Sequence, residues 1–149
     1  MFEGAAALNL DAKGRLAIPA RHRDALLAAG EGSLVLTAHP HGCLLLYPAP
    51  AWQPIRDKIL SGNSLSRTVA AIQRLMVGNA RTESPDGTGR LLIAPELREL
   101  AKLDKTVYLV GMGSHFEIWS EAGWRQQNDL AAEALLGDDL PQDLGDLVL

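Results

Sequence analysis

Cysteine and long apolar runs are both scarce in this chain. Cys43 is the only cysteine among the 149 residues, so no disulfide can form within the chain. The densest apolar stretch, residues 43–47, has the length of a strand, whereas a membrane-spanning helix needs about 20 apolar residues. The first residues also lack the basic segment, apolar core and small-residue cleavage site of a signal peptide. We therefore expect a globular protein located in the cytoplasm.

Basic residues are absent from the last part of the chain. No Lys or Arg follows Arg125, but six acidic residues do: Asp129, Glu133, Asp138, Asp139, Asp143 and Asp146. The formal net charge of the whole chain is −4, which is unusual for a DNA-binding protein because such domains are usually basic. Without the six acids, residues 1–125 carry a net charge of +2. The charge balance therefore allows a nucleic-acid partner, and we expect the acidic tail to lie away from it.

Motifs for catalysis, nucleotide binding and metal binding are also lacking. Residues 87–90 (Gly-Thr-Gly-Arg) are glycine-rich but do not match the Gly-x-x-x-x-Gly-Lys-Ser/Thr pattern of a phosphate-binding loop. His39, His41 and Cys43 lie close together, but zinc sites usually gather four well-spaced ligands, so we interpret this segment as a turn. No motif combines a nucleophile, a base and an orienting group. We expect no enzymatic activity, no cofactor and no metal site.

The clearest positive signal is an internal repeat. Residues 11–19 match residues 86–95 at an offset of 75, with the same Asp, Gly, Arg, Leu and Ile, and Arg23 matches Arg98 at this offset. A second block matches at an offset of 72, pairing Val35 with Val107, Tyr47 with Trp119, and Trp52 with Trp124. We interpret the matched aromatic residues as core rather than as a platform for stacking bases. Two repeats are too few for a solenoid, so the copies must pack on each other or on other chains.

Each copy predicts the same order of elements. A short apolar strand precedes the repeated loop, a glycine in the loop allows the positive φ of a tight hairpin connection, and a second strand follows. Pro19 and Pro95 each then open a short helix, because a proline at the first position loses no hydrogen bond. A hairpin and a second helix complete each copy. The expected elements of the two copies are strand 7–10, strand 16–18, helix 20–29, hairpin 34–37 with 44–47 and helix 52–60, then strand 91–93, helix 96–103, hairpin 106–111 with 116–119 and helix 121–136.

One extra helix is expected between the copies. Residues 61–64 (Ser-Gly-Asn-Ser) supply a break and an N-cap, and Gly78 and Asn79 end the helix. Its apolar stripe, at three- to four-residue spacing, consists of Leu65, Val69, Ile72 and Met76. Other expected helix faces rest on the leucines Leu26 and Leu27, Leu97 and Leu100, and, in an amphipathic tail helix docked on the body, Leu130, Leu135, Leu136 and Leu140. We expect four segments: a first unit 1–60, a connector helix 61–78, a second unit 79–127 and an acidic tail 128–149.

The repeated loop is the candidate functional surface. Arg15 and Arg90 follow the loop glycines by one residue, and the flat guanidinium fork suits a phosphate or a guanine edge. Asp11 and Asp86, four residues earlier, could accept hydrogen bonds from turn amides or hold the arginines in position. A turn-stabilising surface salt bridge, worth about 0–1 kcal/mol, would explain either loop alone. Two identical loops in diverged copies favour a functional role.

These motifs together point to a known family. Residues 1–4 (Met-Phe-x-Gly), residues 10–19 (Leu-Asp-x-Lys-Gly-Arg-Leu-x-Ile-Pro) and residues 86–95 (Asp-Gly-x-Gly-Arg-Leu-Leu-Ile-x-Pro) closely resemble the MraZ family of bacterial transcriptional regulators. The resemblance covers essentially the whole chain. It implies an α+β fold in which two tandem AbrB-like swapped-hairpin units form a β-barrel-like core with peripheral helices. It also implies ring-shaped homo-oligomers that bind short promoter repeats in double-stranded DNA.

The same resemblance assigns the DNA-binding residues. In the family the Asp-x-x-x-Arg loops form the DNA-binding face, which carries over to Asp11, Arg15, Asp86 and Arg90. Lys13 also matches the family pattern, whereas the second copy has threonine at the equivalent position. We expect a nucleoid-associated, sequence-specific transcriptional regulator. The alternatives are an oligomeric scaffold whose loops bind an acidic partner other than DNA, and an enzyme acting at the loops, for which no motif names a reaction.

Overall fold

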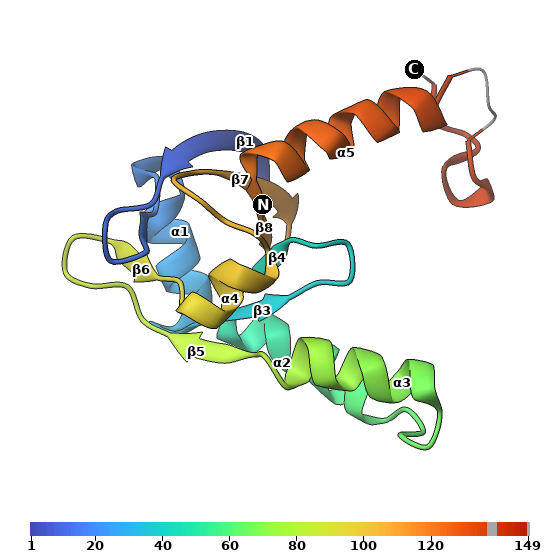
Figure 1. Ribbon diagram of the computed structural model, residues 1–149, viewed down its shortest axis with the longest axis horizontal. Coiled ribbons are helices and arrows are strands. Elements are labelled where there is room, and N and C mark those ends of the chain that lie inside the picture. Colours follow the sequence, from blue (N-terminus) through green and yellow to red (C-terminus); the bar gives the residue numbers. More distant parts are fainter. Residues whose placement is uncertain (137–139, 149) are drawn as a thin grey trace.

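Both copies of the repeat fold into the same series of elements. The computed structural model describes residues 1–136 and 140–148. The first copy contains β1 (Phe2–Asn9), β2 (Arg15–Ala17), α1 (Ala20–Gly30), β3 (Leu34–Ala38), β4 (Leu44–Pro48) and α2 (Ala49–Leu60) (Figure 1). The second contains β5 (Arg81–Glu83), β6 (Arg90–Leu92), α4 (Pro95–Leu100), β7 (Thr106–Gly113), β8 (Phe116–Ser120) and α5 (Glu121–Ala134). The α+β class and the strand, strand, helix, hairpin, helix order are therefore confirmed.

The two copies exchange their first strands. β1 pairs antiparallel with β7 of the second copy, from Phe2 opposite Gly113 to Asn9 opposite Thr106. β5 pairs with β3 of the first copy, with Leu34 opposite Glu83. The result is one six-stranded sheet in the order β1-β7-β8-β4-β3-β5.

This sheet does not close into a barrel. Its edge strands, β1 and β5, do not pair with each other, so the expected barrel-like core is an open sheet. β5 has only three residues against the eight of β1, and it pairs with β3 alone.

The strands around the repeated loops are arranged differently from the expected hairpins. β1 pairs with β7, while β2 pairs with β6 in a separate two-stranded ribbon. The central pair of this ribbon is Leu16 with Leu91. Each loop therefore links two strands that do not pair with each other over their length, and the expectation of a local hairpin was wrong. The loop glycines nevertheless adopt the expected positive φ, +81° at Gly14 and +77° at Gly89.

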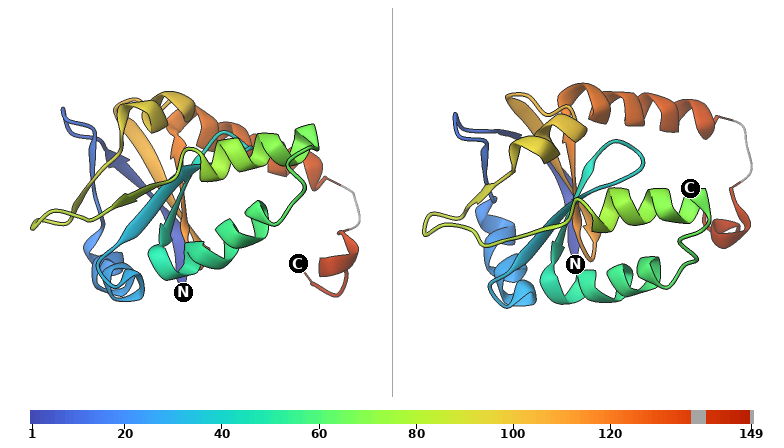
Figure 2. Two further views of the ribbon diagram at one scale, coloured as in Figure 1. Left: turned by 90° about the horizontal axis from the view of Figure 1, so that it is seen from below. Right: turned by 60° about the horizontal axis from the view of Figure 1, so that its bottom comes forward.

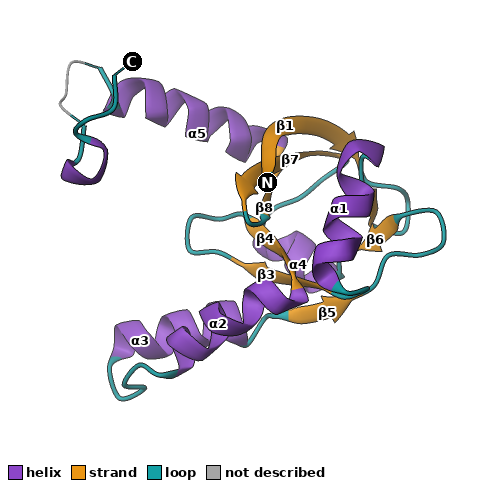
Figure 3. Cartoon of the chain, turned by 180° about the vertical axis from the view of Figure 1, so that it is seen from behind, coloured by secondary structure: helices purple, strands orange, loops and turns teal. Residues whose placement is uncertain are grey.

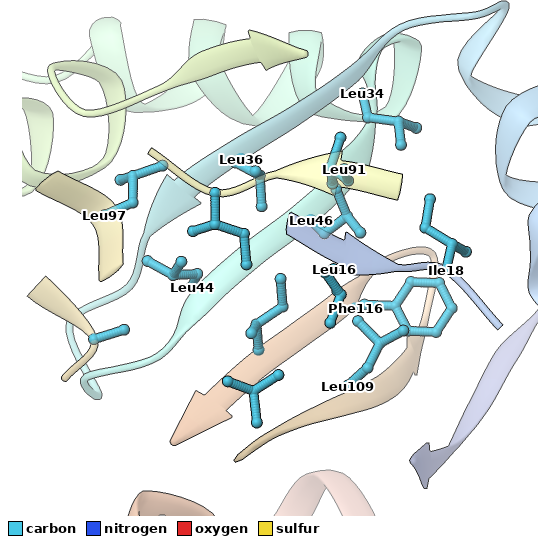
Figure 4. Close-up of a cluster of buried hydrophobic side chains, with 14 of the residues drawn as sticks. Leu16, Ile18, Leu34, Leu36, Leu44, Leu46, Leu91, Leu97, Leu109 and Phe116 are labelled. Carbon is cyan, nitrogen blue, oxygen red and sulfur yellow. The ribbon is translucent and has the colours of Figure 1, made fainter. Parts of the chain in front are cut away.

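The β2–β6 ribbon is buried against one face of the sheet. Leu16 and Leu91 are fully buried and lie over Leu46 and Phe116 of the sheet (Figure 4). Burying one such leucine side chain contributes about 1.5–3 kcal/mol to the stability of the fold. Because Leu16 and Leu91 come from different copies, the core belongs to neither copy alone.

The opposite face of the sheet carries a second apolar cluster under the helices. Side chains alternate across a strand, so Leu34 and Leu36 join the ribbon core while Val35 joins this second cluster. Trp52 of α2 and Met76 of the connector pack onto it. Of the four matched aromatic residues, Tyr47, Trp52 and Trp119 are buried here, which confirms them as core residues, while Trp124 is only partly buried against the same cluster.

The connector begins later than the sequence predicts. α3 (Arg67–Ile72) starts after Ser66, whose hydroxyl accepts a hydrogen bond from the Val69 amide, and it continues as the π-helical turn η1 (Gln73–Val77). Leu65 precedes the helix and is 93% exposed, so its place in the apolar stripe was wrong. Met76 is buried as expected.

Two further leucine predictions were wrong. The first concerns Leu100, the last residue of α4, which is 45% exposed. The helix ends there because Lys102 adopts a positive φ and the Leu103 amide donates a hydrogen bond to the Arg98 carbonyl. α5 contains no buried residue, and Leu130 on it is half-exposed, as is Leu135 just beyond it.

Only the beginning of α5 packs on the strand body, where Trp124 stacks on Tyr108 of β7, and the rest of the helix projects away from it (Figures 1 and 3). Leu136 is exposed and Leu140 is half-buried, while residues 137–139, which include two of the tail acids, lie outside the described residues. A short 3₁₀ turn, η2 (Gln142–Leu144), follows. No helix in the described ranges is long and apolar enough to cross a membrane.

Gly111 of β7 tests the exchange of the first strand. A Cβ atom here would lie 2.4 Å from the Glu3 amide nitrogen and 2.6 Å from the Glu3 Cα in β1. Those are backbone atoms, so Gly111→Ala must push β1 away from β7. We predict that this variant lowers the free energy of unfolding by about 1–3 kcal/mol in urea denaturation.

Gly87→Ala is the matched control, because a Cβ atom at Gly87 meets nothing within 4 Å. It should leave the stability unchanged or raise it by up to about 1 kcal/mol through the entropy of the unfolded chain. Equal stability of the two variants would contradict the close β1–β7 contact.

Candidate functional site

Asp11 organises the first loop (residues 11–15). Its Oδ1 accepts hydrogen bonds from the backbone amides of Lys13 and Arg15, each at 2.9 Å. Its Oδ2 accepts one from Arg15 Nε at 2.7 Å. The backbone closes the turn, because the Gly14 amide donates to the Asp11 carbonyl and the Asp11 amide to the Arg15 carbonyl. One carboxylate thus both folds the loop and orients the arginine, which combines the two roles considered from the sequence.

Asp86 organises the second loop (residues 86–90) in the same way. Its Oδ1 accepts from the backbone amides of Thr88 at 2.9 Å and Arg90 at 3.0 Å, and its Oδ2 accepts from Arg90 Nε at 2.9 Å. Thr88 adds one bond that Lys13 cannot make, from its hydroxyl to Asp86 Oδ1 at 2.9 Å. The second loop therefore lacks the positive charge of Lys13 but has one more hydrogen bond to hold it.

The β2–β6 ribbon brings the two loops together. Ion pairs cross between them, with Arg15 Nη1 3.8 Å from Asp86 Oδ2 and Arg90 Nη1 4.0 Å from Asp11 Oδ2. The four side chains are 25–38% exposed. Both loops project at one end of the molecule, while α2, α3 and α5 extend toward the other (Figure 2). We call Asp11, Arg15, Asp86 and Arg90 the paired-loop cluster. Lys13 lies exposed beside it.

The electrostatics of the cluster keep it charged. The pKa of Asp11 is lowered below its ordinary value of 3.8, chiefly by the hydrogen bond from the Arg15 amide. The pKa of Asp86 is also lowered, chiefly by the Arg90 amide, with the Thr88 hydroxyl adding to the effect. Each arginine uses Nε for its own aspartate, and within the described residues no hydrogen bond engages the Nη groups of either. Those Nη groups can donate to a ligand.

Two further arginines lie directly behind the loops. The guanidinium group of Arg98 lies against Gly14, where a Cβ atom would be 2.6 Å from Arg98 Cζ. Arg23 lies in the same way against Gly89, with 2.7 Å to its Cζ. The sequence repeat matched these two arginines, but we assigned them no role. Their equivalence at the same offset as the loops was the signal that could have found them.

The residues around Cys43 form a turn, as the sequence predicts. The His39 amide bonds to the Cys43 carbonyl, and the His41 amide bonds to His39 Nδ1 at 3.0 Å. Cys43 is buried, and this burial raises the pKa of its thiol to about 12. Within the described ranges, no group of three His, Cys, Asp or Glu side chains is placed to hold a metal ion.

The Thr88 hydroxyl provides a test of the second loop. Thr88→Val removes one hydrogen bond to the Asp86 carboxylate, so we predict that the pKa of Asp86 rises toward 3.8 while that of Asp11 does not change. Carboxyl-detected NMR titration measures both. The carboxylate stabilises the loop fully above pH 3.8, and this stabilisation is lost as the pH falls through the lowered pKa. The loss begins near pH 3.8 in both proteins, but in the variant it should be smaller and should be complete at a higher pH, because the folded-state pKa lies closer to 3.8.

Thr88→Ser keeps a hydroxyl at this position and is the matched control for that titration. It should retain the lowered pKa of Asp86. An Asp86 pKa that is the same in the valine and serine variants would show that the hydroxyl does not act on the carboxylate.

Comparison with known proteins agrees with the repeat. The family model described as "MraZ protein, putative antitoxin-like" matches the chain twice, over residues 1–75 and 76–139. The protein named Transcriptional regulator MraZ from Dechloromonas aromatica (strain RCB) is 80% identical over 149 residues, which is all of both chains. Proteins of the same name from Methylobacillus flagellatus and Bordetella pertussis are 58% identical over 97% of both chains, and 52% identical over 88% of this chain and 92% of the relative. The chain therefore belongs to the MraZ family.

Proposed function

We propose that this protein is a transcriptional regulator that binds double-stranded DNA through the paired-loop cluster. The relatives described above are named transcriptional regulators. The observation that carries the proposal is the convergence of two Asp-x-x-x-Arg loops at one end of the molecule, where each arginine bonds its own aspartate through Nε and places Nη1 within 4.0 Å of the aspartate of the other loop. Binding to chromosomal DNA would make the protein nucleoid-associated.

The geometry suits the major groove of DNA. In that groove an arginine can donate two hydrogen bonds to the O6 and N7 atoms of a guanine. The Nε bonds from Arg15 and Arg90 to their aspartates hold each guanidinium plane before DNA arrives. Less side-chain entropy is then lost on binding. Lys13 is exposed beside the first loop and is suited to a phosphate contact.

Charge balance argues that several subunits act together. The charges of the two aspartates and two arginines in the paired-loop cluster cancel. Only a few other basic residues near the loops can then neutralise phosphates. Neutralisation supplies most non-specific affinity, and a single subunit should therefore bind weakly. We propose a homo-oligomer larger than a dimer, such as a ring, that displays its loops to short promoter repeats. The exposed leucines on and after α5 offer apolar surface for such contacts.

Substitution of the loop arginines tests the proposed contact. DNA fragments selected from a random pool with the purified protein supply the specific probe. Arg15→Ala and Arg90→Ala should each weaken specific binding by about 5- to 150-fold, the equivalent of the about 1–3 kcal/mol of a lost bidentate base contact. Fluorescence anisotropy at fixed salt measures the affinity, and circular dichroism checks the fold.

Arg56→Ala makes the same change of charge on α2, where Arg56 pairs with Asp57 on the surface. This control should bind DNA like the unaltered protein. Wild-type affinity in both loop variants, with the fold intact, would refute the paired-loop cluster as the DNA contact. Salt-sensitive binding that shows no preference among sequences would instead favour a module for acidic partners in general.

The spacing of DNA repeats tests the assembly. When one subunit of an oligomer is bound, neighbouring loops meet the next repeat at high effective concentration, and avidity can rise about 10²- to 10⁴-fold. This requires repeats spaced near one helical turn, about 10–10.5 base pairs. We predict that probes with three repeats bind far more tightly than probes with one. Inserting half a turn between repeats should abolish the gain, and indifference to number and spacing would contradict the proposed oligomer.

A further inference from the structure

Arg23 and Arg98 connect the two copies at the loops. Each lies against the loop glycine of the other copy: the guanidinium of Arg98 fills the space where a side chain of Gly14 would be, and that of Arg23 fills the equivalent space at Gly89. Glycine is required at both positions for two reasons. The φ angles are positive, and the neighbouring space is already occupied.

Each arginine side chain donates a hydrogen bond to a backbone carbonyl of its own copy. Arg98 Nε donates to the Ile93 carbonyl at 3.0 Å, and Arg23 Nη2 donates to the Ile18 carbonyl at 3.1 Å. These carbonyls follow β6 and β2 directly. Both hydrogen bonds are partly buried, which makes them more persistent than an exposed contact.

The same isoleucines bond to the opposite loops through their amides. The Ile93 amide donates to the Gly14 carbonyl at 3.0 Å, and the Ile18 amide donates to the Gly89 carbonyl at 3.0 Å. Gly14, Ile93 and Arg98 therefore contact one another in a closed set. Gly89, Ile18 and Arg23 form the equivalent set. Each set ties one loop to the strand end of the other copy.

We propose that Arg23 and Arg98 are positioning residues that brace the DNA-binding loops crosswise. Arg98 of the second copy braces the loop that carries Arg15, and Arg23 of the first copy braces the loop that carries Arg90. The proposal rests on the function proposed for the loops. The braces hold each loop backbone, and through it the arginine, in the orientation that meets DNA.

The two braces differ in strength. Arg98 donates through Nε, whereas the Nε of Arg23 is buried without a hydrogen-bond partner among the described residues. A buried donor without a partner destabilises its site. The brace on the first loop should therefore be the tighter, and its loss should have the larger effect.

Arg98→Met and Arg23→Met test the proposal, because methionine keeps an unbranched apolar chain and removes the guanidinium. Hydrogen exchange of the Gly14 and Gly89 amides reports on the loops without DNA. Arg98→Met should speed exchange at Gly14 and leave Gly89 nearly unchanged, and Arg23→Met should do the reverse. Equal acceleration at both glycines, or acceleration in the loop of the same copy, would overturn the crosswise arrangement.

DNA binding supplies the second readout. Arg98→Met should weaken specific binding by about tenfold, the size expected for coupling between contacting residues. The loss should be non-additive with Arg15→Ala and additive with Arg90→Ala, while Arg23→Met shows the opposite pairing. An affinity loss with unchanged Gly14 exchange would mean that Arg98 contacts DNA itself, and it would overturn the bracing role.

A conservative variant separates bracing from folding and charge. Arg98→Lys keeps the positive charge but cannot lie as a flat group under Gly14. It should keep the thermal stability and the non-specific affinity of the wild type, yet show fast Gly14 exchange and weak specific binding. Full recovery of specific binding by lysine would overturn the proposal. If Arg15→Ala and Arg90→Ala do not affect DNA binding, the proposed function fails, but the exchange data still decide whether the braces exist.

Discussion

The pairing of β2 with β6 is the contact on which the rest of the structure depends. It joins the two copies at their centre, buries Leu16 against Leu91, and places the two loops side by side. Neither strand is long enough to be stable alone, since each has only three residues. The open six-stranded sheet supports the ribbon from one side, and the exchanged strands β1 and β5 hold the copies together at its edges. The placement of both loops thus depends on the two halves of the chain together.

The charges at the loops combine attraction with restraint. A carboxylate beside an arginine weakens the attraction of that arginine for a phosphate, so the aspartates would be a disadvantage in a site built only for affinity. In this fold each aspartate also accepts hydrogen bonds from two backbone amides of its own loop. The structure therefore favours a defined direction for each guanidinium over the strength of the local positive field. Selectivity among sequences needs such direction more than it needs field strength.

Much of the local structure could be predicted from the sequence, because local patterns determine it. The positive φ of Gly14, the hairpin from Leu34 to Pro48 and the buried matched aromatic residues follow from residue type and periodicity. The exchange of β1 and β5 could not be derived from the residues, because pairing between residues 2 and 113 leaves no mark on either segment. The exposure of Leu65 and Leu130 was missed for a related reason, since spacing alone does not show whether a partner surface exists. The residues of the paired loops were found by their repetition, but their ion pairs across the ribbon depend on tertiary structure.

The exchange of the first strand has a consequence for how the protein is made. β1 is synthesised first, yet its partner β7 ends at Gly113, so most of the chain must be translated before that strand can pair. Until then β1 is an unpaired edge that can recruit other chains. Its alanine-rich centre, residues 5–7, and its one charged residue, Glu3, limit its apolar surface during this interval. Folding of the nascent protein should therefore be concerted and late, in contrast to the domain-by-domain order of chains whose repeats fold independently.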